Sequence, residues 1–260
     1  MTDVVALIRI INGSDAKARA TAHQSLLALK SEAISPLLAT LDTAEAAIRA
    51  TVVRLLPQFD DERIVPRLIQ LTRDSEASVR SFATFGLGRY PGRPDVVAAL
   101  VRVACEDPIG EVCRQAVQAM GRVGTPAQVV DVRLALLKSA DADTVWQAVT
   151  GLGEFRDPRV APALIELLRR PVSDAVLGMA LHALAGTRDS NAFAAIAPFA
   201  GASQAYRRAV AAQALGKLRD PRSLALLGKL TNDTAVAWQE DRGPTMTVGN
   251  IARAELAQGH

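Results

Sequence analysis

Residues whose types could do catalytic or metal chemistry are few in this sequence, and their spacing assembles no site. The three histidines, His23, His182 and His260, have no carboxylate or thiol at metal-ligand spacing within their helices. Cys105 and Cys113 are eight residues apart, which is too far for a CxxC redox pair, and the three scattered histidines form no Cys/His set with them. We therefore predict no catalytic residue, no metal ligand and no cofactor, favour a non-enzymatic protein and expect both thiols to be buried.

Arginine offers a second kind of chemistry, which is the recognition of anionic groups. Arg67, Arg102, Arg133 and Arg169 recur through the chain and could form a basic groove for an acidic partner or a phosphate backbone. The alternative is that such cations complement the dipoles at the last turns of helices. Aromatic residues for base stacking are not interleaved with these arginines, so a nucleic-acid partner is the less favoured alternative.

The segment Ala237–Thr245 (AWQEDRGPT) combines an aromatic residue, opposite charges and a Gly-Pro breaker. Trp and Arg are frequent anchors of protein interfaces, which makes Trp238 and Arg242 candidates for partner binding. The alternative is a solvated loop whose Trp packs back over the end of the chain.

The elements that must position these residues follow from an internal repeat. A short helix-end phrase (FGLGRY, QAMGRV, TGLGEF, HALAGT, QALGKL) recurs about every 32 residues, with a small residue at one shared position. That position is occupied by Gly88, Gly121, Gly153, Ala185 and Gly216. A turn with Asp followed two residues later by Arg recurs in the same phase, at Asp61, Asp157 and Asp220.

Each repeat has the spacing of two helices. One apolar stripe, in a first helix, is formed by Val79, Phe82, Ala83 and Leu87. A second stripe, in the helix that follows the turn at Asp61, is formed by Ile64, Leu68, Ile69 and Leu71. We expect Asp74, Asp107 and Asp174 to be helix N-caps and the prolines near the second helices to mark their starts. No segment alternates with period two, so we predict no strand.

A hairpin with one apolar face must stack on its neighbours. We therefore predict an all-α fold, an α-solenoid of about seven stacked helical hairpins of roughly 32 residues. Residues 1–260 form a single array: a cap over 1–30, regular repeats over 31–236, an insertion loop over 237–246, and a capping helix and tail over 247–260. The net charge of +3, the absence of a membrane-length apolar run and the absence of a signal peptide predict a cytoplasmic protein with no membrane partner.

These repeats resemble the HEAT-like repeats of the phycobilin-lyase (PBS lyase) type. The similar segments are DSEASVRSFATFGLGRY (74–90), FRDPRVAPALIELL (155–168) and YRRAVAAQALGKLRDPRSLALLGKL (206–230). The resemblance implies that an arginine in each first helix pairs with a turn Asp, and this arginine falls on Arg19, Arg49, Arg80 and Arg208. In the central repeats that position holds Cys113, Val145 and Leu177, so these repeats are either more apolar at that seam or differently curved.

The resemblance implies fold more strongly than function. We predict a non-catalytic scaffold or adaptor that holds another protein along its concave face, which the second helices are expected to line. One alternative is a subunit of a phycobilin-type lyase acting on a chromophore–protein adduct, and another is a DNA-binding HEAT-like protein. The sequence specifies no oligomeric state.

Overall fold

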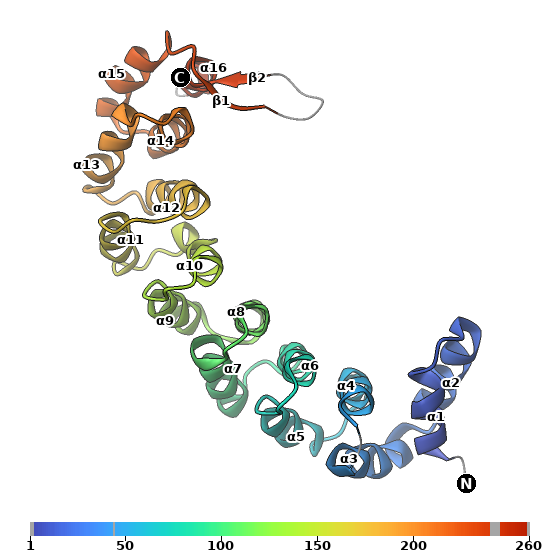
Figure 1. The fold of residues 1–260 in the computed structure, drawn as a ribbon. Helices are drawn as coiled ribbons and strands as arrows, with labels where there is room; N and C mark the ends of the chain where they lie inside the picture. The colour runs from blue at the N-terminus through green and yellow to red at the C-terminus, as the bar shows by residue number, and fades with distance from the viewer. Residues whose placement is uncertain (1–2, 44, 240–244, 259–260) are drawn as a thin grey trace. The chain divides into compact units, whose positions relative to one another are not determined.

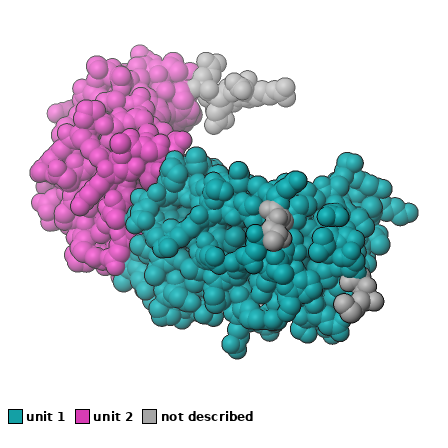
Figure 2. Space-filling model, turned by 60° about the horizontal axis from the view of Figure 1, so that its bottom comes forward, with its two compact units in different colours: residues 1–129 teal, residues 130–260 magenta. Residues whose placement is uncertain are grey.

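The computed structural model describes residues 3–43, 45–239 and 245–258. Over these residues the chain is built almost entirely from stacked helices (Figure 1). Its contacts divide it into two compact units, residues 1–129 and residues 130–260 (Figure 2). The predicted all-α solenoid is confirmed.

Unit 1 holds the first eight α-helices and two short 3-10 helices. They are α1 (Val4–Ile11), α2 (Ala16–Ala28), η1 (Lys30–Ala33), α3 (Ile34–Thr43), α4 (Ala46–Leu55), η2 (Leu56–Gln58), α5 (Ile64–Leu71), α6 (Ala77–Leu87), α7 (Pro94–Glu106) and α8 (Gly110–Val123). The boundary between the units falls within α9 (Pro126–Leu136).

Unit 2 continues the same alternation. Its elements are α10 (Ala142–Val149), η3 (Leu152–Glu154), α11 (Val160–Leu168), α12 (Asp174–Thr187), α13 (Ala192–Ile196), η4 (Ala197–Gly201), α14 (Ala205–Leu218), α15 (Pro221–Leu230), β1 (Val236–Gln239), β2 (Thr245–Thr247) and α16 (Val248–Gln258).

The apolar stripes of the sequence form the core between the helices. Val79, Ala83 and Leu87 on α6 are fully buried, as are Ile64 and Leu68 on α5. Leu71 is buried as well, and the remaining stripe members, Phe82 and Ile69, are half-buried. Prolines lie in the first turns of the second helices, where a missing N–H costs no hydrogen bond.

The helices of each unit form two rows that differ in spacing. In unit 1, the first helices α4, α6 and α8 pack directly on one another, and in unit 2 α10, α12, α14 and α16 do the same. The second helices contact their own row far less, for example α5 with α7 and α11 with α13. The first helices therefore lie on the inner side of the bend in each unit (Figure 1). This placement corrects the expectation that the second helices line the concave side.

The expectation of no strand is wrong at the end of the chain. β1 and β2 pair in antiparallel fashion, with Trp238 opposite Met246 and an irregular register between Val236 and Trp238. Two strands of four and three residues are too short for an alternation to stand out in sequence.

Candidate interaction surface

Ion pairs between neighbouring repeats fix the spacing of the stack. In unit 1, Nε and Nη2 of Arg49 donate to the Asp74 carboxylate at 2.9 and 2.7 Å, and Arg80 donates to Asp107 in the same two-pronged way at 2.7 and 3.0 Å. In unit 2, Arg208 forms the equivalent pair with Asp233. Arg49 and Arg80 each reach from a first helix to the loop that opens the next first helix, whereas Arg208 reaches the loop between α15 and β1. Each pair therefore joins a first helix to the loop after the following second helix.

The family resemblance implies that Arg49, Arg80 and Arg208 pair with a turn Asp. Each does pair with an aspartate, but that aspartate lies in the loop after the following second helix and is none of the turn aspartates of the Asp-x-Arg motif. Arg19 differs, because its guanidinium donates to the backbone carbonyls of Gly13 and Ser14. In the central repeats Cys113, Val145 and Leu177 are all buried, which makes the seam apolar there.

The aspartates of these pairs are not N-caps. Asp74 and Asp107 lie two residues before the N-cap positions Glu76 and Ile109 and accept the backbone N–H groups of those residues. Asp174 is the first residue of α12, whose N-cap is Ser173. The N-cap prediction was wrong because a carboxylate just outside the helix can serve the loop and the arginine of the previous repeat together.

Electrostatics favour the ionised form of Asp74 and Asp233. Burial raises the pKa of Asp74, but hydrogen bonds from Arg49 and from the Glu76 N–H outweigh it and leave the pKa below its ordinary value. The side-chain hydrogen bond from Arg208 likewise lowers the pKa of Asp233.

The three turn aspartates, Asp61, Asp157 and Asp220, are each held by the arginine two residues later. Asp157, for example, accepts from Nε and Nη2 of Arg159 at 3.0 and 2.7 Å and from the backbone N–H of the same residue at 2.9 Å. These bonds, the side-chain bonds first, lower the pKa of Asp157 to about 2. The Asp-x-Arg turn is therefore a clasp between the two helices of a hairpin, and its arginine can also bond the preceding second helix, as Arg159 does with Asp131.

The lowered pKa of Asp157 predicts a pH-dependent contribution to stability. Because an unfolded aspartate titrates near pH ~3.9, the clasp stabilises the fold fully above that pH and loses this contribution as the pH falls through about 2. We expect Asp157→Asn to be less stable than the wild type at pH 6. The difference in stability between the two proteins should narrow between about pH 4 and pH 2. Urea midpoints measured across this range test it, and a gap independent of pH would contradict it.

Most arginines of the predicted basic groove form hydrogen bonds or ion pairs with residues of neighbouring elements. Arg67 pairs with Asp42, and Arg102 donates to the Thr72 hydroxyl. Arg169 is the exposed member and pairs with Glu166 on its own helix.

Arg133 has a different structural role, because it caps a helix. Its Nη1 donates to the carbonyls of Gln147, Ala148 and Thr150 at the end of α10. Burial lowers its pKa. These contacts support the dipole alternative for Arg133 rather than a role in binding a partner.

Trp238 packs on its own repeat array. Its ring lies edge-on to Tyr206 of α14, with centroids 6.3 Å apart and planes at 63°. The indole is half-buried, as expected for a residue that attaches the hairpin to the last repeats. Arg242 lies outside the described residues.

The repeat glycines have unequal surroundings. A Cβ on Gly153 would lie 2.2 Å from the Ala183 carbonyl oxygen, and one on Gly216 would meet the Glu255 side chain, whereas one on Gly121 would meet nothing within 4 Å. A Cβ on Gly88 would lie 2.6 Å from Nη2 of Arg122. Gly88 thus leaves room for the Arg122 guanidinium beside the end of α6.

Arg122 and Phe85 together form an aromatic–arginine patch on the first-helix row of unit 1. The Arg122 guanidinium of α8 lies over the Phe85 ring of α6, 5.2 Å from its centroid. Phe85 is nevertheless 52% exposed, more than the other exposed large hydrophobic side chains of the described chain. An exposed aromatic ring with an arginine stacked on it has the composition of an interface hot spot.

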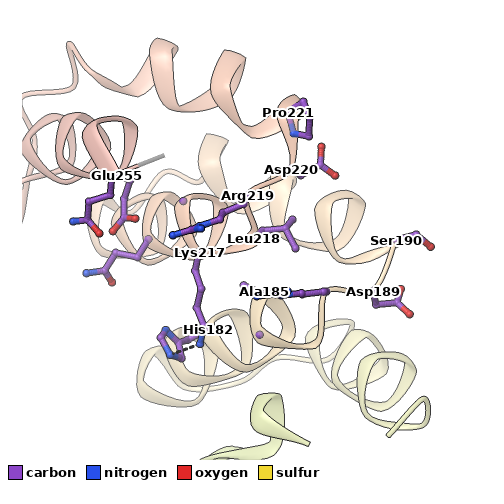
Figure 3. A pocket seen from close by; sticks show the side chains of 15 residues that line it. His182, Ala185, Asp189, Ser190, Lys217, Leu218, Arg219, Asp220, Pro221 and Glu255 are labelled. Atoms are coloured by element: carbon purple, nitrogen blue, oxygen red, sulfur yellow. Dashed lines mark hydrogen bonds between the residues drawn. The ribbon is translucent and has the colours of Figure 1, made fainter. Parts of the chain in front are cut away.

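A hollow of about 1040 Å³ lies in unit 2 at the ends of α12 and α14 and beside α16 (Figure 3). Within it Lys217 of α14 extends to His182 of α12, with 2.6 Å between Nζ and Nε2. Partial burial and the Lys217 charge lower the pKa of His182, and burial lowers the pKa of Lys217. Burial raises the pKa of Glu255 in the same hollow.

Two further findings concern chemistry that the sequence leaves open. Cys113 is buried and its thiol donates to the Asp107 carbonyl, but Cys105 is exposed, which corrects the expectation that both thiols are buried. In the described residues no group of three or more His, Cys, Asp or Glu side chains could hold a metal ion.

No helix of the described chain is long and apolar enough to span a bilayer.

The sequence reasoning missed Phe85, Arg122 and the residues of the hollow. Phe85 lies three residues after Phe82 in α6, off the buried stripe of Val79, Ala83 and Leu87. The helical period therefore carried the signal that Phe85 faces solvent.

Comparisons with known proteins agree with this architecture. Residues 65–132, 111–185 and 130–212 match HEAT repeats, and residues 207–233 match the PBS lyase HEAT-like repeat. A search of curated proteins found no match.

Solved structures of the same fold include YibA from E. coli, with a TM-score of 0.64, 16% identity and coverage of 99% of this chain and 93% of that one. Kap121p gives a TM-score of 0.64 at 15% identity, covering 98% of this chain and 32% of that one. The S. pombe condensin Cnd3-Cnd2 subcomplex gives 0.54 at 16% identity, covering 88% of this chain and 38% of that one.

The HEAT-repeat matches together span more than half of the chain, and they coincide with the helical hairpins and the repeat glycines described above. The chain belongs to the HEAT-repeat family.

Proposed function

We propose that this protein is a non-catalytic scaffold that binds another protein through its row of first helices. The observation that carries the proposal is the aromatic–arginine patch of Phe85 and Arg122. An aromatic side chain that stays half exposed on a well-packed helix row has apolar area that a partner can cover, and Arg122 adds donors beside it.

The inter-repeat ion pairs support this role because they hold the row in one geometry. Arg49–Asp74 and Arg80–Asp107 join the repeats on either side of Phe85. A surface held in its binding geometry loses little conformational entropy when a partner binds. Among the similar structures, the condensin Cnd3-Cnd2 subcomplex is by its name an assembly of proteins, which agrees with such a role.

The proposal predicts that Phe85→Ala weakens partner binding. A protein captured from extracts of the source organism by the wild type would be purified and titrated against variants by calorimetry. We expect Phe85→Ala to raise Kd by roughly thirtyfold, since a hot-spot truncation costs about 2 kcal/mol or more.

Leu224→Ala is the matched control, because Leu224 is 45% exposed on α15, a second helix of unit 2. It should change Kd by less than about twofold. Equal losses in both variants, or no loss in Phe85→Ala, would contradict the proposed surface. Co-purification of a tetrapyrrole or of nucleic acid in place of a protein would favour the lyase or the DNA-binding alternative.

A further inference from the structure

Arginine recurs at one repeat position in unit 2. Three residues after the repeat glycine or alanine stand Arg156, Arg188 and Arg219, one in each of three successive turns. In unit 1 the same position holds Lys30, Asp60, Pro91 and Gly124, so a cation stands there in the first repeat alone and does not recur in successive turns. We call Arg156, Arg188 and Arg219 the arginine row.

The guanidinium groups of the arginine row have no partner within the described part of the chain, and all three residues are exposed. They differ in this from Arg159 and Arg222, which lie three residues further along the turns and clasp Asp157 and Asp220. The packing of the repeats therefore does not account for the arginine row.

Two members of the arginine row adopt a backbone conformation that favours glycine. Arg188 and Arg219 end α12 and α14 in the left-handed region, with φ of 56° and 53°. A residue with a Cβ is strained there, and glycine is the usual occupant of this position at a helix end. Strain of this kind is found preferentially at functional sites.

The arginine row lines a continuous groove. Arg188 borders both the hollow shown in Figure 3, which Arg219 also lines, and a second hollow of about 760 Å³ that Arg156 lines. The two hollows also share Gly186, Asp189 and Ser190. We call the combined space the turn groove.

The turn groove holds charges of both signs, and Lys217 adds a cation to the arginine row. Asp157 and Asp220 are neutralised by their clasp arginines, so they do not offset Arg156 and Arg219. The groove also contains carboxylates without such a clasp: Glu154, Asp189 and Glu255. These acids would repel a continuous phosphate backbone, whereas a peptide can place its own carboxylates at the arginines and its amide N–H groups at the acids.

We propose that the arginine row binds an extended acidic segment of a partner protein along the turn groove. This inference rests on the proposed protein-binding role but uses unit 2, whereas the aromatic–arginine patch is in unit 1. Helices pack at about 8–10 Å, and a chain in the extended polyproline II conformation rises about 3.1 Å per residue with three residues per turn, so every third residue of the segment would meet one arginine.

A labelled ten-residue peptide with Glu at every third position in a Gly/Ser background is the probe, and fluorescence anisotropy at low salt is the measurement. The test variant is Arg156→Ser/Arg188→Gly/Arg219→Gly. We expect it to bind the peptide about tenfold more weakly or worse, because three exposed charge contacts are lost. Its melting temperature should equal or exceed that of the wild type, because glycine relieves the strain at two positions.

The control variant, Arg9→Ser/Arg54→Ser/Arg89→Ser, removes the same charge from exposed arginines of unit 1. Its Kd for the peptide should lie within about twofold of the wild-type value, apart from the loss of long-range attraction between the positively charged protein and the acidic peptide, which salt screens. An equal loss in this control, or no peptide binding by the wild type at millimolar concentration, would overturn the inference. Tighter binding of a dT decamer than of the peptide, lost in the test variant, would overturn it in favour of a nucleic acid.

Phe85→Ala separates the two proposals. It should leave binding of the acidic peptide unchanged, because Phe85 and the turn groove lie in different units. If the peptide binds as expected while Phe85→Ala leaves the captured partner unaffected, the proposed patch fails and the turn groove stands.

Discussion

Replacing Arg80 with alanine is expected to destabilise the protein by about 3–5 kcal/mol, the cost of removing one partner of a buried ion pair. The Arg80 and Asp107 side chains are only 10% and 4% exposed. Arg80 also donates to the carbonyls of Asp74 and Ser75, so its loss leaves acceptors of two loops unsatisfied. The urea midpoint of the variant, compared with that of the wild type, measures the effect.

Two further variants separate the pair from the arginine side chain alone. Arg63→Ala removes a 53% exposed arginine from the Asp61 clasp and should lower the urea midpoint far less than Arg80→Ala does. Arg80→Met/Asp107→Asn removes both charges while Asn keeps an acceptor for the Ile109 N–H, and should be more stable than Arg80→Ala. If the double variant is the less stable of the two, an unpaired Asp107 charge is not the cause of the loss.

The second large effect is expected at Gly153. An alanine Cβ there would lie 2.2 Å from the Ala183 carbonyl oxygen and 2.7 Å from its Cα, and both atoms belong to the backbone of α12. A backbone cannot give way as a flexible side chain can, so we expect Gly153→Ala to cost about 3 kcal/mol. Thermal and urea unfolding of the variant measure it.

Gly121→Ala is the control, and we expect it to change the stability of the fold in the opposite direction. Gly121 occupies the same repeat position, but nothing lies within 4 Å of its Cβ position, and it is inside α8. Alanine should therefore raise stability by about 0.5–1 kcal/mol, because it restricts the unfolded chain and favours the helix. If both substitutions destabilise equally, the repeat glycines have a common role that the packing does not explain.

The fold could be predicted from the sequence because its signals are periodic. The repeat spacing, the apolar stripes through Val79 and Leu68 and the prolines at the second helices are all local patterns. Each of them acts through helix geometry, and the same geometry recurs in every repeat. The β-hairpin escaped prediction because its strands are stabilised by pairing with each other and by contact with Tyr206, which are not local.

The candidate surface could be predicted only in part. Sequence reasoning chose Arg67, Arg102 and Arg133 for their charge, but an arginine can equally satisfy a neighbouring helix, and the structure shows that these three do so. Which helix row lies on the inner side of the bend depends on which row packs more closely. The closeness of packing depends in turn on the sizes of side chains in many contacts at once. The helical phase of Phe85, by contrast, was readable from the sequence.

The arginine row was also within reach of the sequence. Arg156, Arg188 and Arg219 follow the repeat glycine or alanine by three residues in successive repeats. What the sequence does not contain is their left-handed backbone and their lack of a partner, both of which arise from how the turns close between helices.

The central claim is that the first-helix row of unit 1 binds a partner protein at Phe85. Its most direct test is photocrosslinking in intact cells of the source organism, with a benzoylphenylalanine residue introduced at position 85 and, in a parallel strain, at position 224. The account predicts a discrete crosslinked protein from position 85 and none from position 224. A folded protein that yields no crosslinked species at position 85, or the same species at both positions, would contradict it.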